Sequence, residues 1–284
     1  MSCCPSDVCV IVRTCGRPEF LCRALRSIAA QTLLPRQVVV IAEGDDGASV
    51  RALVEGSFSG PAAAVEVIAN PVAVGRSAAL NQGLAAARTT WIAILDDDDT
   101  WDPAFLTEML AVAGARAGNE WFGGVVCRTE AVYERISAAG VEILEKEPFN
   151  PSLTEVRLSA LVRANQFTIH AALWHRRVAE RLGGFRDDLH MLEDWEFNVR
   201  VALEFTIIVL PRMLAHYHLR PPDDRAPNSG AEDLDRMART LRAEWRRAGW
   251  ANRSDEGFVA GLLVELRHRW RRRRSKARWK KRLS

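Results

Sequence analysis

The chain has 284 residues, of which 48% are hydrophobic and 26% are charged, and its formal net charge is +3. This length and composition predict a globular protein with an ordinary core and exclude bulk disorder. No window holds the roughly 18 apolar residues of a transmembrane helix, and the opening MSCCPSDVCVIVRT lacks the basic and long apolar regions of a signal peptide, so we expect a cytoplasmic protein.

Apolar runs alternate with amphipathic stretches over the first part of the chain. Three of the runs nearly lack alternation between apolar and polar residues, which is typical of parallel strands covered by helices on both faces. We therefore expect an α/β fold, an open and mostly parallel sheet flanked by helices. The predicted strands are residues 8–12, 37–43, 64–70 and 91–95, and the predicted helices are 19–30, 48–57 and 77–87.

The second part of the chain continues this pattern less regularly. We predict helices at 103–117, 151–163, 176–183 and 193–204, an apolar segment at 121–133, an extended segment at 166–174, and short strands at 206–211 and 213–219. A Pro-, Gly- and Asp-rich stretch then predicts a linker. The resulting domain division is 1–220 (with halves 1–102 and 103–220), a linker at 221–230, and a helical extension at 231–284.

The cysteines lie mostly near the start of the chain. No CxxC pair occurs, so we expect reduced thiols that fill a strand and a helix face, with a zinc site or a disulfide frame as the alternative. The six residues are Cys3, Cys4, Cys9, Cys15, Cys22 and Cys127.

The end of the chain is strongly basic. Residues 267–284 hold 11 of the 39 Lys and Arg and no acid, so the preceding part is acidic. Trp270 and Trp279 lie among these cations, as in a helix that rests on an anionic membrane surface. A merely solvated cationic end is the main alternative, and nucleic-acid binding is the least favoured interpretation.

Polar side chains follow the predicted parallel strands. Arg13 and Thr14 follow the first strand, Glu43 ends the second, and four consecutive aspartates end the fourth. The carboxyl ends of parallel strands meet at one edge of a sheet, where ligands bind in open α/β folds. We therefore expect these residues to form one binding site.

The stretch AILDDDDTWDP (93–103) crowds four carboxylates behind a buried strand. Such a group either raises the pKa values of its members or binds a cation, and carboxylate oxygens beside a phosphate are typical of a Mg²⁺ site. The alternative is a solvated loop that caps the next helix, to which Asp99 and Asp102 are well placed.

A second acidic feature is EDW, Glu193 to Trp195, at the start of a predicted helix. A carboxylate there can act as a general base toward a hydroxyl. The alternative is the ordinary preference for acidic residues in the first turn of a helix.

Together these segments resemble a family of enzymes. Over residues 8 to about 220 the chain resembles an inverting glycosyltransferase of family 2 with the GT-A fold. The resemblance rests on VCVIVRTCGRPEFLCRALRSIAAQT, on VGRSAALNQGLAAARTTWIAILDDDDTW with its DxD motif, and on LGGFRDDLHMLEDWEFNVR with its Glu-Asp motif.

The resemblance implies a role for each matching position. It implies that Asp98 is the chief ligand of Mn²⁺ or Mg²⁺ and that Asp194 is the catalytic base. His218 is expected to add a metal ligand or to touch the pyrophosphate, and is preferred to His216. The nucleotide-binding positions are Arg13, Thr14, Glu43, Arg76, Asp96 and Asp97, and the expected acceptor-pocket residues are Glu193, Trp195 and His170, the last two with the core as the alternative.

The expected reaction is metal-dependent transfer of one sugar, with inversion, from a nucleotide-sugar donor to a hydroxyl of a carbohydrate or polyprenyl-linked acceptor. UDP is the favoured nucleotide, although Cys15 and Gly16 stand where many relatives have Tyr-Asn. The QxxRW motif of processive synthases is absent, because Leu266 and Ser275 occupy the Gln positions. We therefore expect one sugar per encounter, at the cytoplasmic face of a membrane if the basic tail binds lipid.

Two other functions are considered. A sugar-phosphate nucleotidyltransferase has a similar sheet but needs a glycine-rich phosphate loop after the first strand, which RTCGRPEF is not. A non-catalytic nucleotide-sugar-binding scaffold would have no chemical need for both Asp98 and Asp194.

Overall fold

The structure is a computed structural model that describes residues 6–45, 47–58, 64–137, 140–220 and 231–250. The predicted linker at 221–230, the basic tail at 267–284, and Cys3 and Cys4 lie outside the described residues. Among the described cysteines, Cys9 and Cys127 are buried and Cys22 is half-buried, whereas Cys15 is exposed and does not fill a strand or a helix face.

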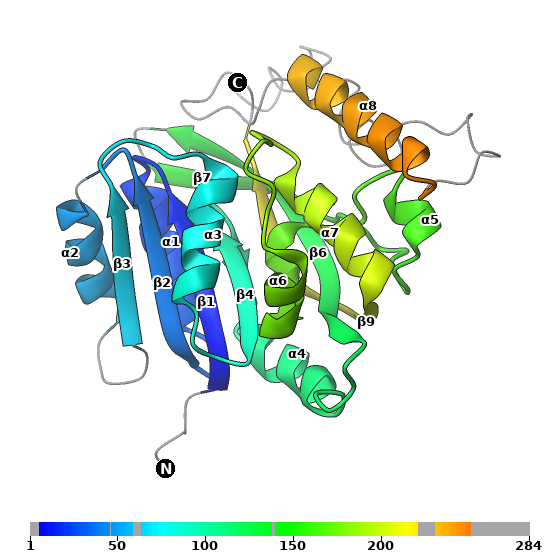
Figure 1. Ribbon diagram of the computed structural model, residues 1–284. Coiled ribbons are helices and arrows are strands. Elements are labelled where there is room, and N and C mark those ends of the chain that lie inside the picture. The colour runs from blue at the N-terminus through cyan, green and yellow to red at the C-terminus, as the bar shows by residue number, and fades with distance from the viewer. Residues whose placement is uncertain (1–5, 46, 59–63, 138–139, 221–230, 251–284) are drawn as a thin grey trace.

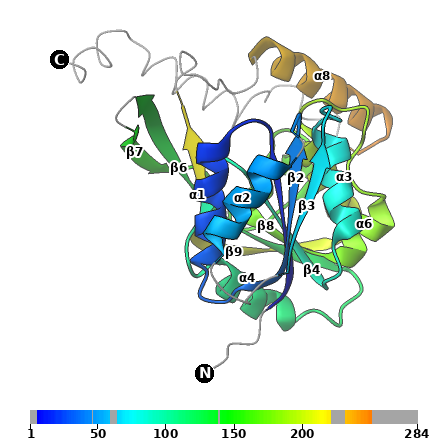
Figure 2. The same ribbon diagram turned by 90° about the vertical axis from the view of Figure 1, so that its left-hand side faces the viewer.

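The first part of the chain forms a parallel sheet with helices on both faces. The strands β1 (Ser6–Thr14), β2 (Pro35–Glu43), β3 (Ala64–Asn70) and β4 (Trp91–Asp96) pair in the order β3-β2-β1-β4 (Figure 1). The helices α1 (Pro18–Ala29) and α2 (Ala48–Ser57) cover one face, and α3 (Arg76–Ala86) covers the other (Figure 2). This double cover explains why β1 is apolar along its whole centre.

Beyond β4 the sheet becomes mixed. Its order continues β4-β8-β6-β9-β5, in which β6 and β9 are parallel while β8 is antiparallel to both of its neighbours. These strands are β5 (Thr100–Trp101), β6 (Phe122–Ser137), β8 (Ala172–His175) and β9 (Thr206–Leu219). The predicted α/β class is confirmed, and the parallel order holds for its first four strands.

The remaining helices flank the mixed part. They are α4 (Phe105–Gly114), α5 (Leu158–Leu161), a 3-10 turn (Ile169–Ala171), α6 (Arg176–Leu182), α7 (Glu193–Glu204) and α8 (Ala231–Arg247). The helix predicted at 193–204 agrees with α7 at both ends, and α6 ends at Gly183 in the left-handed region, as the glycine predicts.

The helix predicted at 151–163 is mostly irregular, and only α5 within it is helical. The Asn150 side chain accepts from the Thr129 backbone N–H at 2.8 Å and donates to the Gln166 carbonyl at 3.0 Å. These bonds tie the start of the segment to β6 and to the chain that follows, so its first residues serve as a crossing loop.

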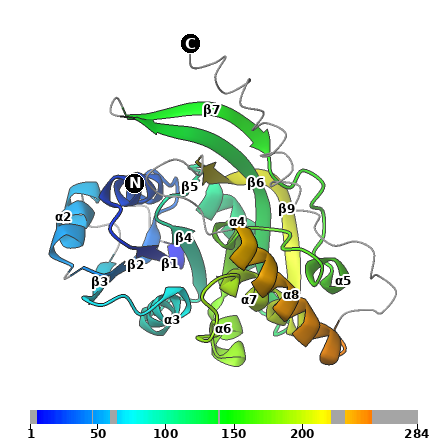
Figure 3. The ribbon, with the colours of Figure 1, turned by 90° about the horizontal axis from the view of Figure 1, so that it is seen from above.

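Two strands differ from the prediction. β7 (Gly140–Pro148) pairs with β6 in a hairpin that extends beyond the rest of the sheet (Figure 3), and its mostly exposed side chains give no strand-like apolar pattern. The two short strands predicted at 206–219 are the single strand β9. Pro211 falls where the pairing of β9 with β6 shifts register, so its missing N–H breaks no regular ladder.

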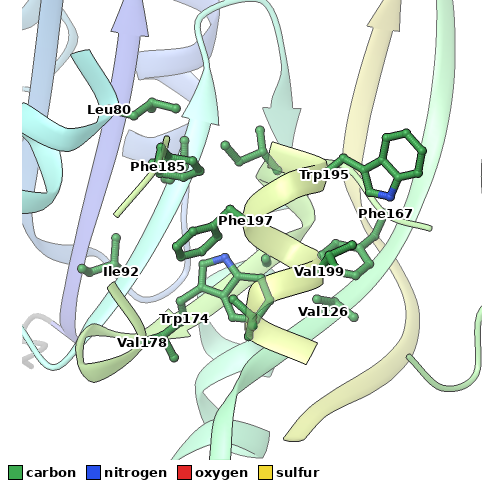
Figure 4. Packing of buried hydrophobic residues seen from close by; sticks show 14 of the residues in the cluster. Leu80, Ile92, Val126, Phe167, Trp174, Val178, Phe185, Trp195, Phe197 and Val199 are labelled. Atoms are coloured by element: carbon green, nitrogen blue, oxygen red, sulfur yellow. The ribbon is translucent and has the colours of Figure 1, made fainter. Parts of the chain in front are cut away.

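One core lies on each face of the sheet. Figure 4 shows the core beneath α7, where Phe197 lies beside Trp174 and Phe185 and Val199 lies near Phe167 and Val126. Buried residues of α8 (Ala238, Leu241 and Trp245) belong to the same core. The helical part of the predicted extension therefore packs onto the domain. None of the helices within the described residues has the length and apolar character needed to span a membrane.

Candidate active site

The ends of β1, β2 and β4 bring the predicted donor-side residues together. Arg13 pairs in register with Asp96 of the neighbouring strand, and the Thr14 hydroxyl donates to Asp97 Oδ2 at 2.7 Å. The three strands therefore place their polar ends side by side, as their parallel arrangement predicts.

Glu43 lies buried at the end of β2 and anchors the loop before α3. Its Oε1 atom forms an ion pair with Arg13 Nε at 2.8 Å, and its Oε2 atom accepts from the backbone N–H groups of Val74 at 3.0 Å and Gly75 at 2.9 Å. Gly75 has a φ of 93°, a left-handed conformation that favours glycine. A uracil N–H at Glu43 would have to share these oxygens.

The aspartates Asp96, Asp97 and Asp98 have different surroundings. Asp97 is buried and accepts from Thr14 and from two nitrogens of Arg17. Asp98 accepts from Arg17 Nη1 at 3.0 Å and from Arg220. The Asp96 side chain is half-buried and has no hydrogen bond to any described residue.

These surroundings separate the pKa values of the carboxyls. Burial, with the Asp99 and Asp98 charges beside it, raises the pKa of Asp96 to about 7. Burial also raises the pKa of Asp97, despite the Arg17 charge. Burial acts in the same direction on Asp98, but Arg17 and Arg220 outweigh it and lower the pKa of that carboxyl. Of the three carboxylates, Asp96 is therefore the one that lacks a hydrogen bond from any described residue to stabilise its negative charge, and a bound cation would stabilise it.

Asp99 is held on the far side of this group. Its Oδ1 atom accepts from the His218 backbone N–H at 2.9 Å, and its Oδ2 atom lies 2.9 Å from His170 Nδ1. Burial lowers the pKa of His170, but Asp99 more than offsets this and the pKa is raised overall. His170 therefore lies behind the donor-side aspartates, which differs from its expected place in the acceptor pocket.

Both ring nitrogens of His218 have protein partners. Nδ1 lies 2.8 Å from Glu134 Oε2, and Nε2 lies 2.9 Å from the Thr100 hydroxyl. Burial raises the pKa of Glu134, but the hydrogen bonds from His218 and Arg23 prevail and lower it to about 2. His218 and Asp98, the two expected metal ligands, thus each have protein partners in this arrangement.

The donor-side acids fit a hard divalent cation. Asp96, Asp99 and His170 offer one ligand atom each, and these atoms lie within 4.8 Å of one another. Carboxylate oxygens at such spacing suit Mn²⁺ or Mg²⁺. The Asp96 carboxylate, which lacks a hydrogen bond to any described residue, is the ligand that could bind without losing a protein contact.

Asp194 lies at the start of α7, half-buried. Its Oδ2 atom accepts from Asn165 Nδ2 at 2.8 Å, and burial together with the Glu193 charge raises its pKa to about 6. Leu192, directly before this helix, has a φ of 61° and is the one non-glycine residue with positive φ within the described part of the chain. This strained turn sets the direction in which α7 presents its first carboxylates.

Glu193 and Arg76 connect the two sides of the site. Glu193 is 6% exposed, its Oε1 atom lies 3.7 Å from Arg76 Nη1, and its Oε2 atom has no hydrogen-bond partner among the residues that the structure describes. Burial lowers the pKa of Arg76, but the charges of Asp96, Glu193 and Asp194 raise it overall. One guanidinium thus interacts with carboxylates from the ends of both β4 and α7.

Trp195 does not contribute to a pocket surface. Its ring is fully buried, its Nε1 atom donates to the Leu161 carbonyl at 2.7 Å, and it meets Trp245 of α8 edge to face at 5.0 Å. This corrects its expected place in the acceptor pocket: the indole N–H finds a buried carbonyl, so the whole ring can join the core.

Sequence reasoning missed several residues of this site. Arg17 belongs to the Arg-Pro pair after β1, and a cation at a strand end was a usable signal. The other missed residues gave no signal in the sequence, because their partners lie far away in the chain. The missed residues are Arg17, Arg23, Glu134, Asn165 and Arg220.

Comparison with known proteins gives a family match. The model of the family described as "Glycosyl transferase family 2" matches residues 9–152, which is half of the chain. The matched range contains the donor-side strands and all four aspartates, and it ends before Asp194.

Two curated proteins are similar in sequence. The uncharacterized glycosyltransferase YwdF of Bacillus subtilis (strain 168) is 24% identical over 238 residues, which cover 81% of this chain and 82% of that protein. The succinoglycan biosynthesis protein ExoO of Rhizobium meliloti (strain 1021) is 35% identical over 109 residues, or 38% of this chain and 30% of that protein.

Solved structures share the fold at low identity. TarS 1-349 of S. aureus in complex with UDP-GlcNAc has a TM-score of 0.60 at 16% identity over 84% of this chain, which spans 66% of that structure, just under two thirds. The mannosyltransferase PcManGT of Pyrobaculum calidifontis, in complex with GDP-Man and Mn2+, has a TM-score of 0.59 at 21% identity over 90% of this chain and 66% of its own. These neighbours confirm the expected GT-A fold.

Proposed function

The chain belongs to glycosyl transferase family 2 and is a glycosyltransferase, and from this we propose that it transfers one sugar, with inversion and with a divalent cation, from a nucleotide-sugar donor to an acceptor hydroxyl. One observation carries the proposal: Arg76 lies 3.7 Å from the acceptor-side carboxylate of Glu193, and the charges of Asp96, on the donor side, and of Glu193 and Asp194 raise the pKa of Arg76 against its burial. A sugar bound between these two groups would have a base on one side and its leaving group on the other.

Asp194 is the proposed base. Its pKa of about 6 makes it mostly ionised at neutral pH and still basic enough to accept a proton in the transition state. It takes the proton of the acceptor hydroxyl, whose oxygen forms the new bond to the anomeric carbon. The bond from that carbon to the diphosphate oxygen breaks, and attack opposite the leaving group inverts the centre.

The aspartates after β4 are the proposed ligands of Mn²⁺ or Mg²⁺. In our assignment Asp98 would hold the cation, and Asp96 and Asp99, whose ligand atoms lie within 4.8 Å of each other, would lie beside it. A bound cation supplies Lewis-acid stabilisation of the charge that develops on the departing diphosphate. The structure of PcManGT in complex with GDP-Man and Mn2+ supports this assignment. His218 joins the ligands only if its ring leaves Glu134 or Thr100.

UDP is the proposed nucleotide, with Arg13, Thr14, Glu43 and Asp97 around its base and ribose. The complexes of TarS with UDP and UDP-GlcNAc support this choice. The complex of PcManGT with GDP-Man makes GDP the alternative nucleotide. The oxygens of Glu43 already accept two backbone N–H groups, so we propose that Glu43 shapes the base site mainly by holding the loop before α3.

A carbohydrate hydroxyl, on a surface glycan or a polyprenyl-linked precursor, is the proposed acceptor. The name of ExoO, a succinoglycan biosynthesis protein, supports a polysaccharide. The basic tail at 267–284 supports a lipid-linked acceptor at the cytoplasmic face of a membrane. Co-sedimentation of the full chain with vesicles of anionic or neutral lipid tests this part, and equal binding to both vesicles would contradict it.

Calorimetry tests the donor site. UDP, dTDP and GDP are titrated into the wild type and Asp98→Ala, each with and without Mn²⁺. We expect one nucleotide to bind in a Mn²⁺-dependent way and Asp98→Ala to remove that dependence. Asp188→Ala, which removes an exposed carboxylate paired with Arg186, is the matched control and should bind as the wild type does. If no nucleotide binds under any condition, the proposed function is wrong.

A further inference from the structure

Glu134 of β6 is a buried carboxylate to which the proposed function gives no role. It is 1% exposed and contacts three side chains, one from α1, one from β9 and one just after β9. Arg23 of α1 donates through Nη1 at 2.6 Å and Nη2 at 3.1 Å. His218 at the end of β9 lies 2.8 Å away, and Arg220, just after that strand, donates through Nη1 at 3.0 Å.

The same two arginines also reach Asp98. Arg220 donates through Nη2 to Asp98 Oδ2, and Arg23 donates to the Asp98 carbonyl at 2.6 Å. The Arg220 side chain is fully buried, with its guanidinium 4.3 Å from the centre of the Phe20 ring. Arg220 thus bridges Glu134 and Asp98, and its position is fixed from two sides.

This arrangement bears on how a cation can reach Asp98. Asp98 Oδ2 already accepts from both Arg17 and Arg220, so a metal ion at that oxygen competes with two guanidinium groups. A buried arginine that loses its only anion is strongly destabilised. Glu134 prevents this for Arg220, because the bond from Nη1 remains when the bond from Nη2 to Asp98 is released.

We propose that Glu134 is a positioning residue for the donor site: it retains Arg220 when Asp98 binds the cation, so that the released Nη2 of Arg220 can bind the diphosphate of the donor. The inference rests on the proposed function, since it concerns the same nucleotide and cation. It adds a diphosphate ligand, Arg220, and the residue that holds it.

Two variants separate this role from a structural one. In Glu134→Gln the negative charge is lost while the side-chain shape is kept, so Asp98 becomes the one carboxylate among the described residues that Arg220 contacts, and Arg220 competes harder with the cation. In Arg220→Gln the competitor is lost together with the diphosphate ligand. The two variants should therefore change different properties of nucleotide binding.

The experiment is calorimetric titration of UDP and UMP into the full chain, with and without Mn²⁺, or of GDP and GMP if guanine is selected. In Glu134→Gln we expect the gain in UDP affinity from Mn²⁺ to fall about tenfold, the worth of one charge-assisted hydrogen bond. In Arg220→Gln we expect the preference for UDP over UMP to fall by about as much, with UMP binding unchanged.

Glu130→Gln is the matched control. Glu130 lies on the same strand, pairs with His216 at 3.2 Å and with Lys146 at 3.0 Å, and contacts none of the aspartates after β4. In Glu130→Gln, both the gain in UDP affinity from Mn²⁺ and the preference for UDP over UMP should equal those of the wild type. If Glu134→Gln fails to fold, the UDP to UMP ratio of Arg220→Gln decides the question.

The outcomes separate this inference from the proposed function. A wild type that binds no nucleoside diphosphate overturns both. A wild type with Mn²⁺-dependent UDP binding, together with a Glu134→Gln variant that has a lower Tm but unchanged ratios, overturns only the inference. In that case Glu134 merely neutralises buried cations.

Discussion

Asp194 is the residue whose protonation state should govern the reaction rate. Its pKa of about 6 arises from burial and from the neighbouring Glu193 charge. We expect kcat/KM to rise about tenfold per pH unit below pH 6 and to level off above it, because only the carboxylate can accept the hydroxyl proton. Release of nucleoside diphosphate from the selected donor, measured between about pH 4.5 and 8.5, checks this. A flat profile through pH 6 would contradict the assignment.

The same residue allows a test that couples activity to stability. Asp194→Asn keeps the acceptor oxygen for Asn165 but removes the base, so we expect a rate loss of about 10²–10⁴ with donor binding intact. The pKa of about 6 in the folded protein exceeds the ordinary aspartate value of 3.8, so the Asp194 contribution to stability is present below pH 3.8 and lost as pH rises through 6.

The difference in Tm between Asp194→Asn and the wild type should therefore shift in favour of the variant when the pH is raised from 4 to 8. Thermal unfolding at both pH values measures this shift. An equal loss of Tm at both pH values, with loss of donor binding, would show that Asp194 is structural.

Among the elements, α3 depends on a glycine for its position. A Cβ atom added at Gly83 would overlap Ile11 of β1 and lie 3.0 Å from Ile41 Cδ1 of β2. We expect Gly83→Ala to lower the free energy of unfolding by about 1–3 kcal/mol through overpacking. Gly56→Ala in α2 is the control: its Cβ meets open space, so we expect a gain of about 0.5–1 kcal/mol. Urea denaturation measures both, and equal effects would contradict this packing.

Prediction from sequence succeeded for elements that carry their own signal. α7 was predicted at both ends because its apolar spacing and acidic first turn agree, and the parallel strands were predicted from their continuous apolar runs. β7 was missed because a strand with mostly exposed side chains depends on its partner β6 rather than on a buried face. α5 was predicted too long because the bonds of Asn150 hold the preceding chain elsewhere.

Across the whole molecule, α8 and the sheet form one core. Trp245 of α8 is buried against Trp195 of α7. We expect Trp245→Ala to lower the free energy of unfolding by about 3–5 kcal/mol while unfolding stays a single transition. Trp121→Ala, at a position 51% exposed, should have a much smaller effect. Circular dichroism and fluorescence should give coincident melting curves, and a separate early transition would show that α8 folds independently.

The sequence also predicted only those site residues that lie at the ends of recognisable elements. The ends of parallel strands meet by topology, so Thr14, Glu43 and the aspartates could be expected at one edge from sequence alone. Arg220 reaches Asp98 from 122 residues away, and Asn165 reaches Asp194 across 29, through packing that no local pattern records. Trp195 shows the converse, since a residue inside a recognised motif lies in the core.

The chain of contacts from Glu134 through Arg220 to Asp98 limits how this protein can be recombined with its relatives. The division into a nucleotide-binding half and an acceptor half invites chimeras that join the first half of one enzyme to the second half of another. Residues of β6 and the end of β9 complete the surroundings of the donor aspartates, so such an exchange would also replace part of the donor site. A chimera meant to change only the acceptor must keep Glu134, His218 and Arg220 from the parent that supplies the aspartates.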